Sequence, residues 1–193
     1  MVYEDLINAH KNYETKFDFD KVYKKLIQPI KDPWADLDSI IEFVRKWNRR
    51  VPIGRNKEKI KEVVLSLSKK FGILKNYNIE NFEFNQKNIE IVKIIYQKLS
   101  ETVLRNTGTT KIMHAINTIN KNLFIMWDKG ICQHYGYYQN STGYIHFMKE
   151  MQENAQKIIK EHNKSDIITK TGITLPKLLD EYNWINYRTS KSL

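Results

Sequence analysis

A lysine and an aspartate near the middle of the chain carry side chains suited to covalent and acid–base chemistry. Lys111 falls near the start of a predicted helix, and Asp128 stands seventeen residues later, directly after the apolar stretch Leu123–Trp127. A lysine amine that is desolvated on a largely apolar helix becomes nucleophilic and can form a Schiff base with an electrophilic carbon. A carboxylate can stabilise positive charge that develops beside it, or deprotonate a nucleophile. The pair therefore marks the segment 104–135 as a candidate catalytic region.

Both residues also have plain structural interpretations. An aspartate before a helix is a common N-cap, and a lysine in a first helical turn is common on protein surfaces. His114 shares a helix face with Lys111, so it is either a contact of the pocket or of a phosphate, or a structural histidine. His134 and His146 lack the spacing of metal ligands, so we expect no metal. Cys132 is interpreted as a small apolar filler.

Aromatic residues surround the pair. Trp127 precedes the aspartate, and Tyr135 begins the cluster Tyr135–Tyr138 around a glycine. Such rings either stack on a flat ligand or pack against the core. On the last predicted helix, Asp180–Trp184 includes polar groups that can face a pocket.

Helical periodicity predicts the elements that must hold these residues in place. The expected helices cover 33–47, 57–71, 89–104, 109–119, 128–135, 144–159 and a last segment from 175. The stretch Leu123–Trp127 is a short strand, a buried helical segment or an extended linker. We therefore expect an all-α fold, a compact bundle of seven to nine helices in a single helical domain over residues 1–193. The domain is either one lobe or two lobes with a cleft between them.

Composition narrows the class of protein. The chain has 193 residues with 41% hydrophobic residues, and only 7 Gly and 4 Pro. This length and apolar content suffice for a packed core, and the scarcity of turn residues favours long helices. A single cysteine excludes an internal disulfide and a four-cysteine cluster, and it favours a reducing, intracellular setting. No apolar stretch approaches the ~20 residues of a membrane span, so we expect no membrane association.

The positive charge is concentrated in one segment. Of 32 basic residues, eleven lie within residues 43–75, opposed only by Glu58 and Glu62, so this segment holds +9 of the formal +10. Such a block is typical of a surface that binds a polyanion, or of a solvated helix face. The residues expected to contact a nucleic-acid backbone here are Arg45, Lys46, Arg49, Arg50 and Arg55.

The segment 104–135 (LRNTGTTKIMHAINTINKNLFIMWDKGICQHY) resembles the core motif of the helix-hairpin-helix DNA glycosylase superfamily. That motif has a glycine-containing hairpin, then a helix with a lysine near its start. An apolar stretch follows and ends in an aspartate that caps a further helix. Here the glycine is Gly108, the lysine Lys111 and the aspartate Asp128. The family usually has two glycines in the hairpin, whereas this chain has one.

The resemblance implies a base-excision enzyme that acts on a damaged base in duplex DNA. Lys111 would attack the sugar with assistance from Asp128, which adds AP lyase activity, and oxidised guanine is the expected base. The substrate-binding residues would be His114, Trp127, His134 and Tyr135. Gly108 and Thr109 would hold the DNA backbone. We expect a monomer without cofactor or iron–sulfur cluster, located in the cytoplasm at the nucleoid.

Two other classes of function remain open. The protein is alternatively a non-catalytic helical nucleic-acid-binding protein, in which the basic segment supplies affinity and Lys111 and Asp128 are structural. The third class is an interaction module with a solvated basic face.

Overall fold

Eleven α-helices form the part of the chain that the computed structural model describes, which is residues 1–17, 19–48, 51–117 and 122–188. These residues contain no strand, so the predicted all-α fold is confirmed. The helices are α1 (Tyr3–Lys16), α2 (Phe19–Leu26), α3 (Leu37–Trp47), α4 (Lys57–Ser66), α5 (Ser68–Leu74), α6 (Gln86–Ser100), α7 (Arg105–Ile116), α8 (Lys129–His134), α9 (Ser141–Glu161), α10 (Lys164–Thr171) and α11 (Leu175–Asn183). Short 3₁₀-helices, η1 (Gly54–Asn56) and η2 (Ile79–Asn81), precede α4 and α6. A short π-helix, η3 (Trp184–Arg188), extends α11.

The helix count exceeds the predicted seven to nine for two reasons. The sequence analysis did not identify α1, α2 and α10. It also predicted one helix from Lys57 to Phe71, whereas the structure has two, because the backbone of Leu67 (φ −95°, ψ 0°) leaves helical geometry between α4 and α5. Gly72 lies inside α5 rather than beyond a helix end.

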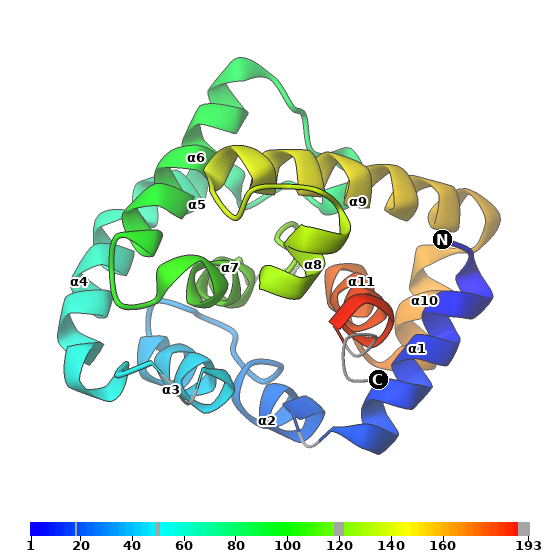
Figure 1. The fold of residues 1–193 in the computed structure, drawn as a ribbon, viewed down its shortest axis with the longest axis horizontal. Helices are drawn as coiled ribbons and strands as arrows, with labels where there is room; N and C mark the ends of the chain where they lie inside the picture. The colour runs from blue at the N-terminus through cyan, green and yellow to red at the C-terminus, as the bar shows by residue number, and fades with distance from the viewer. Residues whose placement is uncertain (18, 49–50, 118–121, 189–193) are drawn as a thin grey trace.

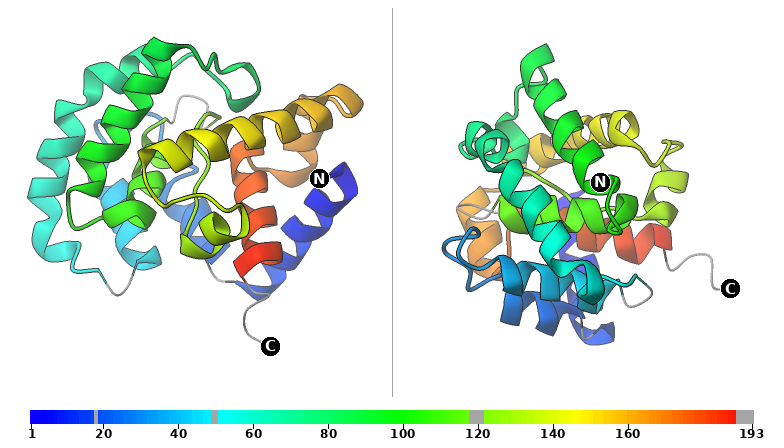
Figure 2. Two further views of the ribbon diagram at one scale, coloured as in Figure 1. Left: turned by 45° about the horizontal axis from the view of Figure 1, so that its top comes forward. Right: turned by 90° about the vertical axis from the view of Figure 1, so that its left-hand side faces the viewer.

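The helices surround a common core of buried side chains that extends from Leu6 to Leu179 along the chain. In Figure 1, α4 lies along the left edge, α9 crosses the top and α1 lies along the right edge. Helices α7, α8 and α11 are seen near the centre of this view. Figure 2 shows α11 beside α1 again after rotation, in agreement with the contacts between these two helices. Among the described residues, no helix is long and apolar enough to span a bilayer.

The apolar stretch Leu123–Trp127 is neither strand nor helix; it is a fully buried, extended segment. A buried extended backbone needs partners for its polar groups, and α7 supplies several of them. Thr110 Oγ1 accepts from Trp127 N at 3.2 Å, His114 Nδ1 lies 2.7 Å from the Phe124 carbonyl oxygen, and Asn117 Oδ1 accepts from Leu123 N at 3.3 Å. These three residues are four and three positions apart, so they form one face of α7.

This pairing fixes where Lys111 and Asp128 lie. Thr110 immediately precedes Lys111, and Trp127 immediately precedes Asp128. The bond between Thr110 and Trp127 therefore brings the lysine and the aspartate to the same place, although seventeen residues separate them.

Candidate active site around Lys111 and Asp128

Lys111 and Asp128 line one pocket, together with residues from α1, α3, α8 and α11. The empty space in this pocket amounts to about 410 Å³, including its open mouth. The pocket is narrow, because the centre of a water molecule can occupy only about 40 Å³ of this space. The lining residues are Tyr13, Trp47, Lys111, Met126, Trp127, Asp128, Ile131, Asp180 and Trp184. Aromatic and charged groups thus converge here from segments that are far apart in the sequence.

Lys111 is a buried lysine, with 8% of its surface exposed. Its Nζ donates a hydrogen bond to Asn48 Oδ1 at 3.1 Å and lies 5.7 Å from the centre of the Trp47 ring. Both partners stand at the C-terminal end of α3. A polar partner and an aromatic face stabilise the ammonium, and they also orient its nitrogen at the pocket wall.

Asp128 caps α8, as the sequence predicts. Its Oδ1 accepts from the backbone N–H groups of Gly130 at 2.9 Å and Ile131 at 3.1 Å. This bonding satisfies two of the amides that a helix start leaves without intrahelical partners. The capping interaction holds the carboxylate in a fixed orientation at the pocket, so the structural role and a chemical role are compatible.

Asp180 places a second carboxyl group in the pocket. It is 5% exposed, and burial raises its pKa to about 6, against the opposing effect of the nearby Lys177 ammonium. The charge of Lys111, which lines the same pocket, also lowers the pKa of Asp180.

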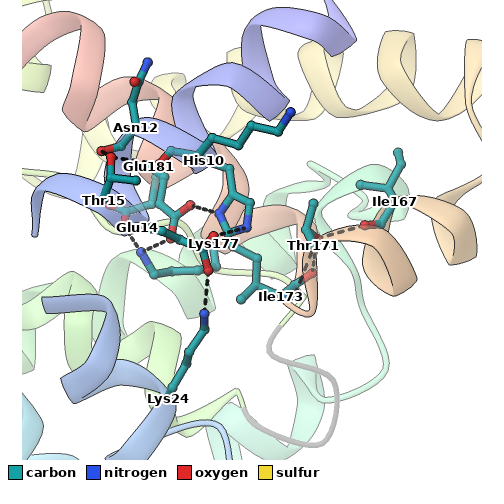
Figure 3. A network of polar contacts seen from close by, with 12 residues as sticks. His10, Asn12, Glu14, Thr15, Lys24, Ile167, Thr171, Ile173, Lys177 and Glu181 are labelled. Atoms are coloured by element: carbon teal, nitrogen blue, oxygen red, sulfur yellow. Dashed lines mark hydrogen bonds and ion pairs between the residues drawn. The ribbon is translucent and has the colours of Figure 1, made fainter. Parts of the chain in front are cut away.

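A cluster of buried charged residues lies behind Asp180. Lys177 Nζ is 3.2 Å from Asp180 Oδ2 and 2.9 Å from Glu181 Oε1, and Glu181 Oε2 is 2.7 Å from His10 Nδ1. Figure 3 shows His10, Lys177 and Glu181 pointing toward one another from α1 and α11. Each of these residues is at most 5% exposed, so their charges are compensated by one another rather than by solvent.

The structure gives His114 a structural role, against the expectation that it contacts substrate or phosphate. Its side chain is fully buried on the face of α7 that bonds the extended segment. Because the Phe124 carbonyl can only accept, His114 Nδ1 donates to it and Nε2 accepts from the Tyr23 hydroxyl at 2.8 Å. Of the predicted substrate contacts, Trp127 does line the pocket, with most of its ring packed against Tyr144 and Phe147.

His134 and Tyr135 lie outside the lining of the Lys111 pocket. His134 is exposed and stacks on Tyr187, with ring centres 3.5 Å apart. The Tyr135 hydroxyl donates to Asn183 Oδ1 at 2.6 Å. Both residues follow Asp128 closely in sequence, but α8 carries them to a neighbouring surface depression that also includes Glu150.

Gly108 and Thr109 do not form a hairpin ahead of the lysine helix. Both lie inside α7 and are buried, and the Gly108 amide already donates to the Leu104 carbonyl oxygen. A Cβ at position 108 would stand 3.1 Å from Leu104, so the glycine serves close packing. This burial is incompatible with the predicted backbone contacts, and the chain instead reverses between α6 and α7 just before Arg105, whose φ is +49°.

Two of the basic residues expected to bind a nucleic-acid backbone lie on the helix that carries the pocket residue Trp47. Arg45 and Lys46 are exposed at the end of α3, directly before Trp47. They line a surface depression together with Arg55. Arg49 and Arg50 lie outside the described residues. The end of α3 therefore links the basic segment to the Lys111 pocket, a connection that the sequence analysis did not predict.

Several residues that line the pocket were not predicted as site residues from the sequence. Tyr13 lies on α1, which was not predicted as a helix, and Trp47 lies at the end of α3. Lys177, which lies behind the pocket, was not predicted as a site residue. The spacing of Lys177, Asp180 and Glu181 (i, i+3 and i+4) is the same as that of a solvated surface ion pair. Only their burial distinguishes the two cases.

Comparisons of the chain with family models, with curated proteins and with solved structures found no match. The arguments about function therefore rest on the geometry of this site.

Proposed function

We propose that this protein is a DNA base-excision enzyme, a DNA glycosylase with AP lyase activity. The observation that supports this proposal best is that Lys111 and Asp128 line one pocket with aromatic walls. A nucleophilic amine and a carboxylate beside a flat, mostly apolar cavity suit the removal of a base from its sugar. The proposed substrate is duplex DNA with a damaged base, with oxidised guanine the expected base, and the enzyme acts as a monomer at the nucleoid.

The two residues have complementary roles in the proposed reaction. The Lys111 ammonium first loses a proton to solvent, and the neutral amine then attacks C1′ of the deoxyribose. The N-glycosidic bond breaks with its electron pair leaving on the base, which takes up a proton. Asp128 stabilises the positive charge that develops on the sugar. After ring opening and loss of the amine proton, the C1′ imine permits elimination of the 3′ phosphate, which is the lyase step.

The aromatic walls of the pocket suit a base that has been extruded from the DNA double helix. Trp47, Trp127 and Trp184 line the pocket, and rings of this kind stack on bases in a sequence-tolerant way. Extruding a base costs a few kcal/mol, and such a cost is lower for a damaged or mismatched base. The narrowness of the pocket implies that its walls separate slightly when a base enters.

The basic surface next to the pocket fits the DNA backbone. Arg45 and Lys46 lie on the last turn of the helix that carries Trp47 and Asn48. Phosphate contacts at this position fix the register of a duplex without reading its sequence. DNA held there would present a nucleotide to the pocket that contains Lys111.

Borohydride trapping on a panel of lesions tests the proposal. Duplexes that carry oxidised, deaminated, alkylated or abasic sites are incubated with the protein and sodium borohydride, which reduces an imine to a stable amine. We expect a covalent adduct with at least one lesion, and its loss in Lys111→Gln. Lys129→Gln is the matched control, because Lys129 is an exposed lysine next to Asp128.

Two outcomes would contradict the proposal. An adduct that persists in Lys111→Gln would remove this lysine from the chemistry. If no lesion gives base release or an adduct, but duplex binding weakens steeply with salt, the protein is the non-catalytic nucleic-acid-binding protein instead.

A further inference from the structure

Lys177 carries a charge that solvent does not reach. Its side chain is fully buried, and Nζ lies 2.9 Å from Glu181 Oε1 and 3.2 Å from Asp180 Oδ2. Removing an ammonium group from water is costly unless carboxylates compensate it. Burial alone would lower the pKa of Lys177, but Glu181, Tyr13 and Asp180 outweigh that effect and hold the pKa well above its ordinary value. Lys177 is therefore a permanent cation inside the protein.

The two carboxylates that pair with Lys177 face different parts of the molecule. Asp180 lines the Lys111 pocket. Glu181 is not among the residues that line this pocket, and it meets His10 of α1, as Figure 3 shows. Lys177 thus connects one wall of the pocket to the helix behind it.

Three aromatic rings complete the surroundings of Lys177. The ring centres of Tyr13, Tyr23 and Trp47 lie 4.4, 5.3 and 5.4 Å from its Nζ. Tyr13 and Trp47 are themselves walls of the pocket. Trp47 also interacts with Lys111, so two lysines contact the same ring. Cation–π attraction in a dry site restrains the ring as well as the ammonium.

We propose that Lys177 is a positioning residue of the Lys111 pocket, which holds Trp47 and Asp180 in place and sets the charge of the Asp180 carboxyl group. It acts through these two neighbours rather than on the reacting atoms. The consequence for catalysis rests on the proposed function, whereas the effect on Asp180 can be measured without any substrate.

The charge of Asp180 depends on a balance between its neighbours. Burial raises its pKa to about 6, and Glu181 adds to this rise, whereas Lys177 and Lys111 lower the pKa. Asp180 is therefore mostly ionised at neutral pH and accepts hydrogen bonds at the pocket wall. Without Lys177, the carboxyl group would hold its proton at neutral pH and would present a donor instead.

The titratable and charged groups that face this site come from several elements. They are Lys177 and Glu181 on α11, Lys111 on α7, Asp128 before α8, His10 and Tyr13 on α1, Tyr23 on α2 and Tyr144 on α9. Burial raises the pKa values of Tyr23 and Tyr144 well above their ordinary range, so both stay neutral. Lys177 and Glu181 are the two charges next to Asp180 on its own helix, and they act on it in opposite directions.

NMR titration of protein labelled with ¹³C at the aspartate carboxyl carbons tests the role of Lys177. The Asp180 signal is identified by its absence in Asp180→Asn. In Lys177→Met we expect its titration midpoint to rise by about one to three pH units, as for loss of a neighbouring opposite charge. In Glu181→Gln we expect the midpoint to fall, because a like charge is removed. Lys177→Arg keeps the charge and should leave the midpoint near that of the native protein.

The pH profile of borohydride trapping gives the catalytic readout. We expect the acid limb of the profile to move in the same direction as the Asp180 midpoint in each variant, upward for Lys177→Met and downward for Glu181→Gln. A lysine that merely filled space would lower the trapped yield equally at every pH and shift neither quantity.

The outcomes separate this inference from the proposed function. An unchanged Asp180 midpoint in folded Lys177→Met, or shifts of equal sign in Lys177→Met and Glu181→Gln, would overturn the role of Lys177. If Lys177→Met does not fold, the direction of the Glu181→Gln shift decides. If opposite shifts occur but no lesion is ever trapped, the role of Lys177 stands and the glycosylase proposal fails.

Discussion

The protein has two charged regions that are organised in opposite ways. In the Lys111 pocket and directly behind it, charged side chains from α1, α7 and α11 are buried, and Lys177 and Glu181 each have partners within 3.2 Å. In the basic segment 43–75, the charged side chains that the structure describes lie at the surface and are close together in sequence. Buried charges depend on specific partners and tolerate few changes, whereas exposed charges act together through a field that salt screens.

Acidic residues that lie outside the basic segment in sequence compensate part of its positive charge in the folded protein. Glu42 pairs with Arg45 through bonds of 2.6 Å, and Asp38 pairs with Lys57 and Lys61. These acidic residues precede the segment, but α3 and α4 place them against it. Arg55 makes no ion pair with any residue that the structure describes. Part of the positive charge counted in the sequence is therefore compensated by neighbouring carboxylates in the folded protein.

The largest expected effect lies in the pocket, at Asp128. Asparagine is as good an N-cap as aspartate, so Asp128→Asn should leave the melting temperature nearly unchanged. It removes the negative charge, and we expect single-turnover base release to fall by about 10²- to 10⁴-fold. Asp128→Ala is the contrasting control, since it also loses the cap, at a cost of about 1 kcal/mol in stability. Unchanged turnover in Asp128→Asn would remove this residue from the mechanism.

Asp180→Asn should make the protein more stable at neutral pH. The pKa of Asp180 is raised from 3.8 to about 6 by folding, so the folded state binds its proton more tightly than the unfolded state. The stability that this group contributes is fully present below pH 3.8 and is lost as pH rises through about 6. We expect urea unfolding to show a gain of roughly 1–3 kcal/mol for the variant at pH 7.5 and none near pH 3.5. Glu153→Gln, which changes an exposed carboxylate, should show no such pH dependence, and a gain at both pH values for Asp180→Asn would refute the assignment.

Removing positive charges from the basic segment should weaken duplex binding moderately, and by different amounts at different residues. We expect Arg55→Gln to weaken duplex binding a few-fold and to reduce the slope of log affinity against log salt by about one. Arg45→Gln should have less effect, because Glu42 already compensates Arg45. Lys157→Gln, on the exposed face of α9, is the control. Equal losses for all three variants would mean that DNA does not bind preferentially at the end of α3.

The smallest expected effect is a change in the free energy of unfolding from a substitution at the turn between α6 and α7. Arg105 is exposed and has a φ of +49°, a conformation that glycine adopts without cost. Arg105→Gly should therefore raise the free energy of unfolding by up to about 1 kcal/mol. Arg105→Ala keeps the strain and should bring no gain. A destabilised Arg105→Gly would show that the arginine side chain makes contacts that outweigh the strain.

Sequence reasoning was most reliable where a local rule decides the structure. The capping role of Asp128 and the helix predicted over residues 144–159, observed as Ser141–Glu161, follow from neighbouring residue types alone. It was least reliable where burial decides. His114 has the spacing of a pocket residue, yet it is buried and bonds Tyr23 and the Phe124 carbonyl. His134 and Tyr135 follow Asp128 closely, yet α8 carries them away from the pocket.

The sequence by itself determined the all-α class, the concentration of positive charge in one segment and the presence of a lysine and a capping aspartate near the chain's middle. These properties depend on composition, periodicity and nearest neighbours, which are local. The tertiary structure alone decided that Lys111 and Asp128 share a pocket, that the end of α3 brings the basic surface to it, and that Lys177 is a buried cation behind it. These features depend on contacts between residues 17 to 171 positions apart, or on whether an ion pair lies in water or in the core. A pattern of residue types is the same in both cases.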